Sequence, residues 1–343
     1  MMGRLGLKAE IEAANTIVIK PNFCGGWVRA DSHVASDLTL LRDVVLAALE
    51  MNSQATLFIA ESDSTSYVSA YSKFAHLGLP ESLLLDGEAA KRVDMLDLSR
   101  DRLLRVSQDN FRYFCTKDRQ LWLSETLVDA DFVVSLSNSK THVRTGFTGA
   151  CKNLFGCLPA LDKTPYHPQI HKVIHDLAIA ISPQLSIVDA FYAMEGNGPV
   201  AGRAIDCGYL VFSSDATEAD LCASECAGLI PTQIKYLSYL IQTTQACEPG
   251  RKKYPTIVKL SKPTAFARAA YGIGSIFQVV GSAMVRSGKR IEGRRSLAQA
   301  LFPTARSLGM LMQPVLLRVF GERTVEKMKR VIAKQLGHHP HSD

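Results

Sequence analysis

Short apolar, β-branched runs recur along the chain, and each run passes into a polar segment and then into a helical pattern. The runs are TIVIKPN (16–22), ATLFIAESDS (55–64), DFVVSLSNSKTH (131–142), QLSIVDAFYAMEGNGP (184–199) and CGYLVFSSDATEAD (207–220). Near-continuous apolar strands are typical of sheets buried on both faces, and alternation of strands with helices is typical of parallel sheets. The pattern therefore predicts an α/β body with a mostly parallel open sheet and helices on both faces.

Helical patterns separate the predicted strands, at about residues 36–50, 68–77, 169–181 and 218–227. In the first of them, Ser36 or Asp37 is available as the N-cap, and apolar residues follow at helical spacing. Two shorter strands are predicted at 92–98 and 103–108. Past Gly250 the pattern changes to helices rich in Arg, Ala and Leu, so we expect two parts, an α/β body over 1–248 and a basic, mainly helical extension over 249–343.

The five apolar runs end in unusually polar sequences, which read KPN, ESDS, SNSKTH, DAFYAMEGNGP and SSDATEAD. In open α/β sheets, ligands bind just beyond the carboxyl ends of the strands. Because these five ends share Lys, Asn, Ser, Asp, Glu and His, we expect them to form one common small-molecule or metal site.

The densest polar stretch is SNSKTHVRTGFTGACKNLFGCLP, in which Lys140, His142, Arg144 and Lys152 alternate with glycines. Glycine lets the backbone approach a ligand closely, and cations neutralise an anion, so this stretch favours a phosphate or a carboxylate. It contains no Walker loop, and no G-x-G-x-x-G follows a strand. The alternative interpretation is a glycine-rich loop with solvated cations.

The histidines and acidic residues of the sequence are also compatible with a divalent metal as the ligand. In YHPQIHKVIHD, His167 is expected near a helix cap, and His171 and His175 follow one turn apart. Two histidines at i, i+4 can share a metal, but the motif is not H-E-x-x-H. The acidic set comprises Glu61, Asp63, Asp189, Glu195, Asp215 and Asp220. Carboxylates at strand ends can hold Mg²⁺ or act as general acid or base, whereas Asp215 is equally suited to cap a helix.

These observations give three sets of candidate residues. The expected catalytic residues are His142, Asp189 and Glu195. The expected anion-binding residues are Lys20, Asn22, Lys140, Thr141, Lys152, Asn153, Gly196 and Gly198. The candidate metal ligands are Asp215, Asp220, His167 and His171.

Cysteine spacing argues against an iron–sulfur cluster. The eight cysteines form no C-x-x-C and no C-x₂-C-x₂-C-x₃-C run, so the chain has no 4Fe-4S ligand set of the ferredoxin type. The first 16 residues are too polar for a secretory signal, and no window approaches 18 consecutive apolar residues. We therefore expect a cytoplasmic protein with reduced thiols.

Charge is distributed unevenly along the chain. Residues 250–343 contain 18 Lys or Arg and 4 Asp or Glu, against 21 and 29 in the remaining residues. Such a basic segment predicts contact with an anionic membrane surface, self-association, or packing on an acidic body. It contains no recognised nucleic-acid module, so nucleic acid is not expected as a partner.

Several segments together resemble a known family, the domain of unknown function 362 family. They are IKPN, LSNSKTHVRTGFTGACKNLFGCLP, IVDAFYAMEGNGP and SSDATEADLCASECAGL, within about residues 16–245. The resemblance implies no reaction. Many relatives carry a 4Fe-4S module whose cysteines are absent from this sequence. Relatives often read D-P-V-A-x-D where this chain reads Asp215-Ala-Thr-Glu-Ala-Asp220, which keeps both acids.

Three functions are compatible with these features. The first is an enzyme that acts on a small anionic metabolite or cofactor precursor, with or without a divalent metal. The second is a non-catalytic protein that holds such a molecule for a partner. The third is a protein of a membrane surface, in which the basic extension is the anchor.

Overall fold

The computed structural model describes residues 5–24, 33–64, 68–160, 162–244 and 253–265. By its internal contacts the chain divides into Met1–Val279 and Val280–Asp343, and all described residues belong to the first unit. The basic extension predicted for 249–343 lies outside the described residues except for 253–265. Those residues pack on the body, where the N–H groups of Ile257 and Leu260 donate to the carbonyls of Cys226 and Ala227.

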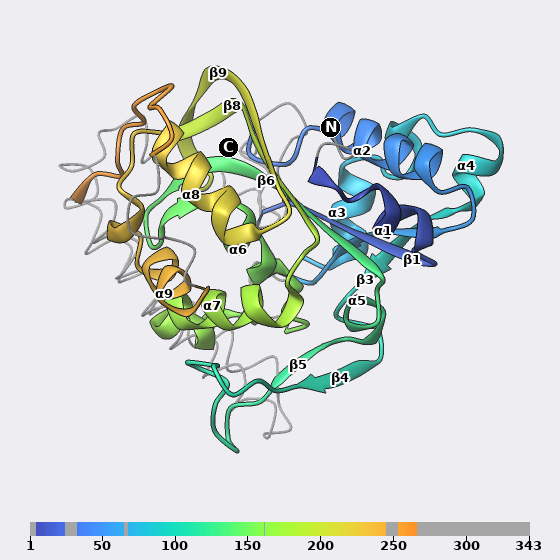
Figure 1. The fold of residues 1–343 in the computed structure, drawn as a ribbon, viewed down its shortest axis with the longest axis horizontal. Coiled ribbons are helices and arrows are strands. Elements are labelled where there is room, and N and C mark those ends of the chain that lie inside the picture. Colours follow the sequence, from blue (N-terminus) through green and yellow to red (C-terminus); the bar gives the residue numbers. More distant parts are fainter. Residues whose placement is uncertain (1–4, 25–32, 65–67, 161, 245–252, 266–343) are drawn as a thin grey trace, which may run out of the picture. The chain divides into compact units, whose positions relative to one another are not determined.

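A seven-stranded sheet forms the centre of the fold, with the order β3-β2-β1-β6-β8-β9 and with β7 paired to β6 (Figure 1). Its strands are β1 Thr16–Pro21, β2 Thr56–Glu61, β3 Val93–Asp97, β6 Phe132–His142, β7 Gly146–Thr148, β8 Leu185–Asn197 and β9 Ala201–Ser213. Five of them are parallel, and β7 and β9 run antiparallel to their neighbours. The predicted mostly parallel sheet is thus confirmed. The strand predicted at 103–108 instead belongs to a separate antiparallel pair, β4 Leu103–Val106 and β5 Leu121–Ser124.

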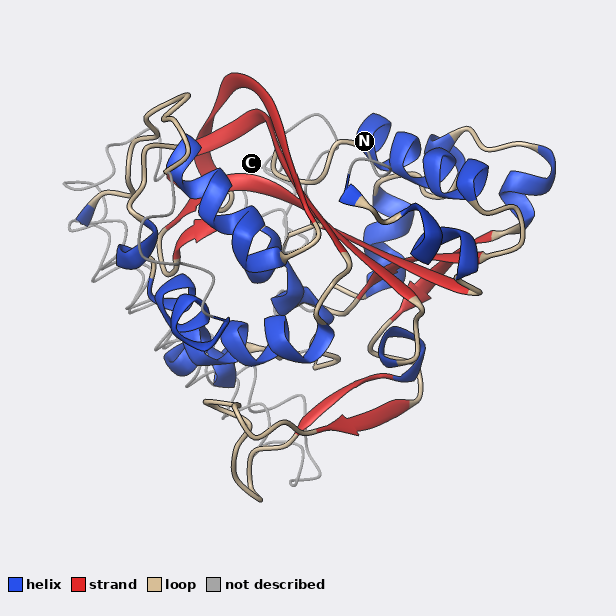
Figure 2. Ribbon diagram, in the orientation of Figure 1, coloured by secondary structure: helices blue, strands red, loops and turns tan. Residues whose placement is uncertain are grey.

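Helices cover both faces of this sheet, as predicted (Figure 2). One face carries α1 Lys8–Ala13, α2 Leu38–Met51, α3 Ala70–His76 and α4 Gly87–Lys91. The other carries α6 Ala150–Asn153, α7 Ile170–Ile181, α8 Ala216–Cys226 and α9 Lys235–Thr244. The remaining elements are α5 Glu125–Val128 and the 3₁₀ helices η3 Glu81–Leu83, η4 Leu154–Cys157, η5 Thr164–Gln169 and η6 Pro231–Gln233.

Alternate residues of β1 supply the two cores. Ile17 and Ile19 face the α1–α4 side, whereas Val18 faces the α6–α9 side, and all three are at most 1% exposed. A slip of one residue would exchange the two sets, so burial on both faces fixes the register. Burying each of these side chains contributes about 1.5–3 kcal/mol.

The direction of β9 corrects one expectation, that all five polar strand ends meet at one edge. Because β9 returns from β8 as a hairpin, Ser213 pairs with Ser186 near the start of β8. The SSDATEAD segment therefore lies at the amino edge of the parallel strands. In addition, β8 continues as strand through Asn197, where the sequence predicted a polar loop after its apolar start. An apolar run identifies a strand but does not give its direction or its end.

Two aspartates of α8 hold helix ends in place. Asp215 caps α8 itself, because its side chain accepts from the N–H of Glu218 at 2.7 Å. Asp220 is fully buried and accepts from the N–H groups of Ala150 and Cys151, at 2.6 and 3.3 Å, at the start of α6. It also accepts from the Tyr236 hydroxyl at 2.9 Å, so one carboxylate joins α6, α8 and α9.

We predict that Asp220→Ala lowers the free energy of unfolding by about 3 kcal/mol or more, because three buried donors lose their acceptor. Asp215→Ala, at the exposed cap, should cost about 1 kcal/mol. Urea unfolding of both variants measures the difference. Equal losses would contradict the role assigned to Asp220.

Candidate functional site

A cavity of about 220 Å³ lies at the carboxyl ends of β1, β2 and β6, between these strands and the segment that runs from α6 to α7. Among the described residues that line it are five lysines and one arginine, against a single carboxylate, that of Glu61. The cations are Lys20, Lys73, Lys140, Arg144, Lys152 and Lys163. They come from four separate stretches of sequence, which are β1, α3, the segment from β6 to α6, and the residues just before η5.

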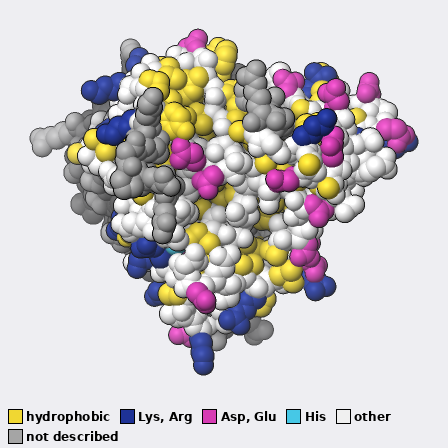
Figure 3. All heavy atoms as spheres, in the orientation of Figure 1, with side chains coloured by type: hydrophobic (Ala, Val, Ile, Leu, Met, Phe, Trp, Pro, Cys, Tyr) yellow, Lys and Arg dark blue, Asp and Glu magenta, His cyan; other side chains and the backbone are white. Residues whose placement is uncertain are grey.

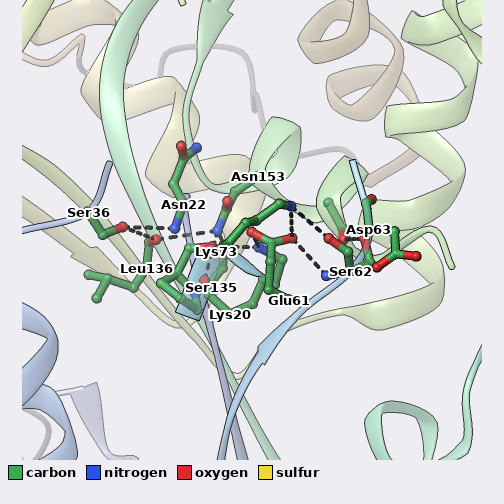
Figure 4. Close-up of polar contacts among 12 residues, drawn as sticks. Lys20, Asn22, Ser36, Glu61, Ser62, Asp63, Lys73, Ser135, Leu136 and Asn153 are labelled. Atoms are coloured by element: carbon green, nitrogen blue, oxygen red, sulfur yellow. Dashed lines mark hydrogen bonds and ion pairs between the residues drawn. The ribbon is translucent and has the colours of Figure 1, made fainter. Parts of the chain in front are cut away.

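Glu61, at the end of β2, is the centre of a buried ion cluster (Figure 4). Its oxygens lie 3.2 Å from Lys20 Nζ and 3.5 Å from Lys73 Nζ, and all three side chains are at most 3% exposed. Burial alone would raise the pKa of Glu61. The Coulombic attraction of Lys20, Lys73 and Lys163 outweighs burial, so the pKa of Glu61 is lowered. The carboxylate is therefore ionised and its charge is shared among several lysines.

Lys163 lies beside this cluster without a direct bond to Glu61. Its ammonium donates to Ser62 Oγ at 2.6 Å and to the carbonyl of Asp63. Burial lowers the pKa of Lys163 to about 7, because the Coulombic effect of Glu61 offsets burial only in part. The amine is thus able to take up or give up a proton near neutral pH.

Lys140 is completely buried in β6 and reaches across to β1. Its ammonium donates to Asn22 Oδ1 at 3.2 Å and to the carbonyl of Val34. Burial lowers its pKa. Asn153 also connects β1 with β6. Its amide donates to the Lys20 carbonyl at 2.9 Å and to Ser135 Oγ at 3.2 Å, as Figure 4 shows.

Three polar groups in the cavity wall have no partner within the described part of the chain. Lys152 makes no hydrogen bond or ion pair there, and its ammonium lies 5.0 Å from the centroid of the Phe155 ring. The Thr148 hydroxyl and His167 Nδ1 are buried and accept or donate no hydrogen bond. Burial lowers the pKa of Lys152 to about 8 and that of His167 to about 4. Buried polar groups normally have partners, so these three are suited to a bound ligand.

His142, at the end of β6, presents a neutral ring. Its Nδ1 accepts from the N–H groups of Arg144 and Thr145, at 3.0 and 3.3 Å. Burial holds its pKa well below the usual range, and the charge of Lys152 adds to this effect. A neutral ring whose Nδ1 accepts hydrogen bonds carries its proton on Nε2, so Nε2 is a donor.

One glycine of the predicted stretch lies directly against the protein's own lysine. A Cβ at Gly156 would lie 2.9 Å from Lys20 Cε and 3.0 Å from its Nζ. The sequence analysis attributed glycines in this stretch to a close approach of ligand. At Gly156 the close approach is made by Lys20.

The structure brings together Lys20, Asn22, Lys140, His142, Lys152, Asn153 and His167 of the predicted residues. It does not place Asp189 or Glu195 among the lining residues. Asp189 lines a different cavity with His33 and Phe191, and Glu195 pairs with Arg203 and accepts from the N–H of Ser261 at 2.9 Å. Both acids lie within β8, which continues beyond the point where the sequence predicted a loop.

Thr141, Gly196 and Gly198 join β6 to β8 and are not among the residues that line the cavity. The Thr141 hydroxyl donates to the carbonyl of Gly196 at 2.9 Å. A Cβ at Gly198 would lie 2.0 Å from the Thr141 carbonyl oxygen, which explains the glycine at this position.

The four candidate metal ligands do not converge. His167 and His171 line different cavities, Asp215 caps α8, and Asp220 binds the start of α6. In the described ranges, no three His, Cys, Asp or Glu side chains are grouped so that they could hold a metal ion.

Sequence reasoning placed Glu61 in the acidic set but not among the three sets of candidate residues, and it overlooked Lys73, Thr148 and Lys163. Glu61 ends a strand and belonged to the acidic set, so its position was a usable signal. Lys73 lies on the inner side of α3 next to buried Phe74, and a lysine within an apolar helix face was also a usable signal. Lys163 precedes η5 in an irregular segment whose local sequence does not show that it is buried.

The visible surface does not repeat this concentration of cations. On the face drawn in Figure 3, Lys and Arg side chains form small separate groups among Asp and Glu. The five lysines of the cavity wall lie in the interior, where a lower dielectric strengthens their interaction with an anion.

Fold and cavity define an α/β protein with a cationic pocket at the carboxyl edge of a mostly parallel sheet. Residues 17–225 match the model of the family described as Domain of unknown function (DUF362), and the chain belongs to that family. The resemblance found in the sequence is thereby confirmed.

One similar protein is the Thylakoid-associated protein sll1697 of Synechocystis sp., which is 32% identical over 166 residues. The match covers 46% of this chain and 49% of the relative, so it spans about half the length of each. No helix of the described residues is long and apolar enough to cross a membrane. Contact of residues 250–343 with a membrane surface or with a second copy stays a prediction, as does a cytoplasmic location.

Among solved structures, the lactate racemase apoprotein from Thermoanaerobacterium thermosaccharolyticum is similar with a TM-score of 0.39 and 14% sequence identity. The similarity covers 65% of this chain and 51% of that chain. At this TM-score the similarity carries no argument about function.

We predict that Glu61→Gln lowers the free energy of unfolding at about pH 7 by about 3–5 kcal/mol, because it leaves buried lysines without their carboxylate. The folded-state pKa of Glu61 is lowered, so its contribution is present above the unfolded pKa of about 4.3. The difference between wild type and variant should therefore shrink as the pH falls below about 4. Urea unfolding at several pH values measures it.

Glu88→Gln is the matched control for this variant. Glu88 is exposed and pairs with exposed Lys91, so its loss should change stability by less than about 0.5 kcal/mol. If Glu61→Gln is as mild as Glu88→Gln at neutral pH, the ion cluster does not hold the site together.

Proposed function

We propose that this protein is an enzyme that binds a small, multiply charged anion, with phosphate or carboxylate groups, in the cavity between β1, β2, β6 and η5. One observation carries the proposal. Among the described residues the cavity wall contains six cations and one carboxylate. Within the same residues, Lys152, the Thr148 hydroxyl and His167 Nδ1 make no hydrogen bond or ion pair. An anion would supply both the missing charge and the missing hydrogen bonds.

The size of the cavity supports a small ligand. Pockets for drug-sized molecules have volumes of about 300–1,000 Å³, whereas this cavity measures about 220 Å³. A divalent metal is not part of the proposal, because the single carboxylate in the described wall is already paired with Lys20 and Lys73. The other lining cations would repel a metal ion.

The enzymatic part of the proposal is a proton transfer that involves Lys163. Its pKa of about 7 lies near the pH at which a general base works best. The neighbouring cations favour an anionic substrate and would stabilise negative charge that develops on it during the reaction. His142 adds a neutral imidazole ring to the same wall.

We predict that Lys152→Met weakens binding of pyrophosphate by about 10- to 100-fold, the loss expected for one charge-assisted hydrogen bond. Lys152→Arg keeps the charge and should lose less. Isothermal titration calorimetry measures both affinities, and thermal melting shows whether the variants stay folded.

Lys91→Met is the control, because Lys91 is exposed on α4 and does not line the cavity. It should leave pyrophosphate binding unchanged. Wild-type protein that does not bind pyrophosphate, sulfate or a dicarboxylate would refute the proposed anion site.

We also predict that sulfate binds more weakly as the pH rises from about 6 to about 9. Sulfate keeps its charge over this range, so the change reports on the protein. Lys163 and Lys152, with pKa values of about 7 and about 8, lose their positive charge as the pH rises. Calorimetry in buffers with different ionisation enthalpies should show proton uptake on binding, and a pH-independent affinity would contradict this assignment.

A further inference from the structure

A second cavity, of about 290 Å³, adjoins the first, and the two share His142 and Arg144 as lining residues. The second cavity lies between the β6–β7 turn, the start of α7 and the segment around η6. Its described lining residues include Lys235 and Lys262 but no Asp or Glu. The excess of positive charge therefore continues from the first cavity into the second.

His171 supplies an unpartnered polar atom in the second cavity. Its Nδ1 is buried and has no hydrogen-bond partner. Burial lowers its pKa to about 4, and the charges of Lys235 and Arg144 add to this effect. His167 has the corresponding unpartnered Nδ1 in the first cavity, one helical turn earlier. Each of the two adjoining cavities is thus lined by a histidine whose buried Nδ1 has no hydrogen-bond partner among the described residues.

The remaining wall of the second cavity is partly apolar. Leu229, Ile230, Ile234 and Pro263 line it together with the cations. A ligand that fits here has an apolar portion as well as an anionic group, because apolar walls stabilise apolar surface.

We propose that the two adjoining cavities bind one elongated ligand that has an anionic group at each end. This inference rests on the proposed function of the first cavity and specifies its substrate class. One anionic group lies near Lys152 and the other near Lys235 and Lys262, and the body of the ligand passes His142 and Arg144. Joining two anions in one molecule makes the second contact intramolecular, so the affinity exceeds that of either anion alone.

The test uses α,ω-alkanediphosphonates of increasing chain length, each compared with the alkylmonophosphonate of the same length by calorimetry. We expect an affinity maximum at one chain length, at least about tenfold above the monophosphonate. Lys235 is exposed and its ammonium lies 5.9 Å from the centroid of the Tyr239 ring, so Lys235→Met should fold normally. This variant should lose most of the gain at that chain length, whereas Lys235→Arg should keep the gain.

Two outcomes would overturn the inference while leaving the first site intact. One is a diphosphonate affinity that does not depend on chain length. The other is a Lys235→Met variant that binds the best diphosphonate as well as wild type does. A wild-type protein that binds neither sulfate nor pyrophosphate would be a different result, because it would refute the proposed function itself.

Discussion

The pairing of Glu61 with Lys20 and Lys73 is the interaction on which the candidate site depends. It joins β1, β2 and α3, and its charge also reaches Lys163 before η5. Bringing several ammonium groups into a protein interior is costly unless a carboxylate offsets their repulsion. Glu61 offsets part of it, while burial, the largest cause, lowers the pKa values of Lys140, Lys152 and Lys163. The described wall of the cavity holds six Lys and Arg side chains against one carboxylate.

The sequence was sufficient to predict the sheet, because strands that are buried on both faces are apolar at consecutive positions, such as Ile17, Val18 and Ile19. It also identified Lys140, His142 and Lys152, since they are close together in one glycine-rich stretch. Local pattern carries this information, and the structure places all three in one cavity.

The acids were harder to place. Asp189 and Glu195 lie within β8 because the strand continues, and Asp215 lies at the opposite sheet edge because β9 is antiparallel. Strand direction depends on long-range pairing, which one sequence does not reveal. Lys73 and Lys163 enter the cavity from a helix and an irregular segment, so tertiary packing alone makes them neighbours of Glu61.

The contact between Gly149 and Asp220 has an evolutionary consequence. A Cβ at position 149 would lie 2.1 Å from Asp220 Oδ1, while the same carboxylate holds the first turn of the helix that carries Lys152. Neither position can change first without cost, because a larger residue at 149 displaces the carboxylate and a shorter residue at 220 releases the helix. A Cβ at position 149 would also lie 2.8 Å from Phe147 Cε1, so shortening residue 220 alone does not make room for it. Through Asp220, α8 therefore restrains sequence change at the start of the helix that carries Lys152.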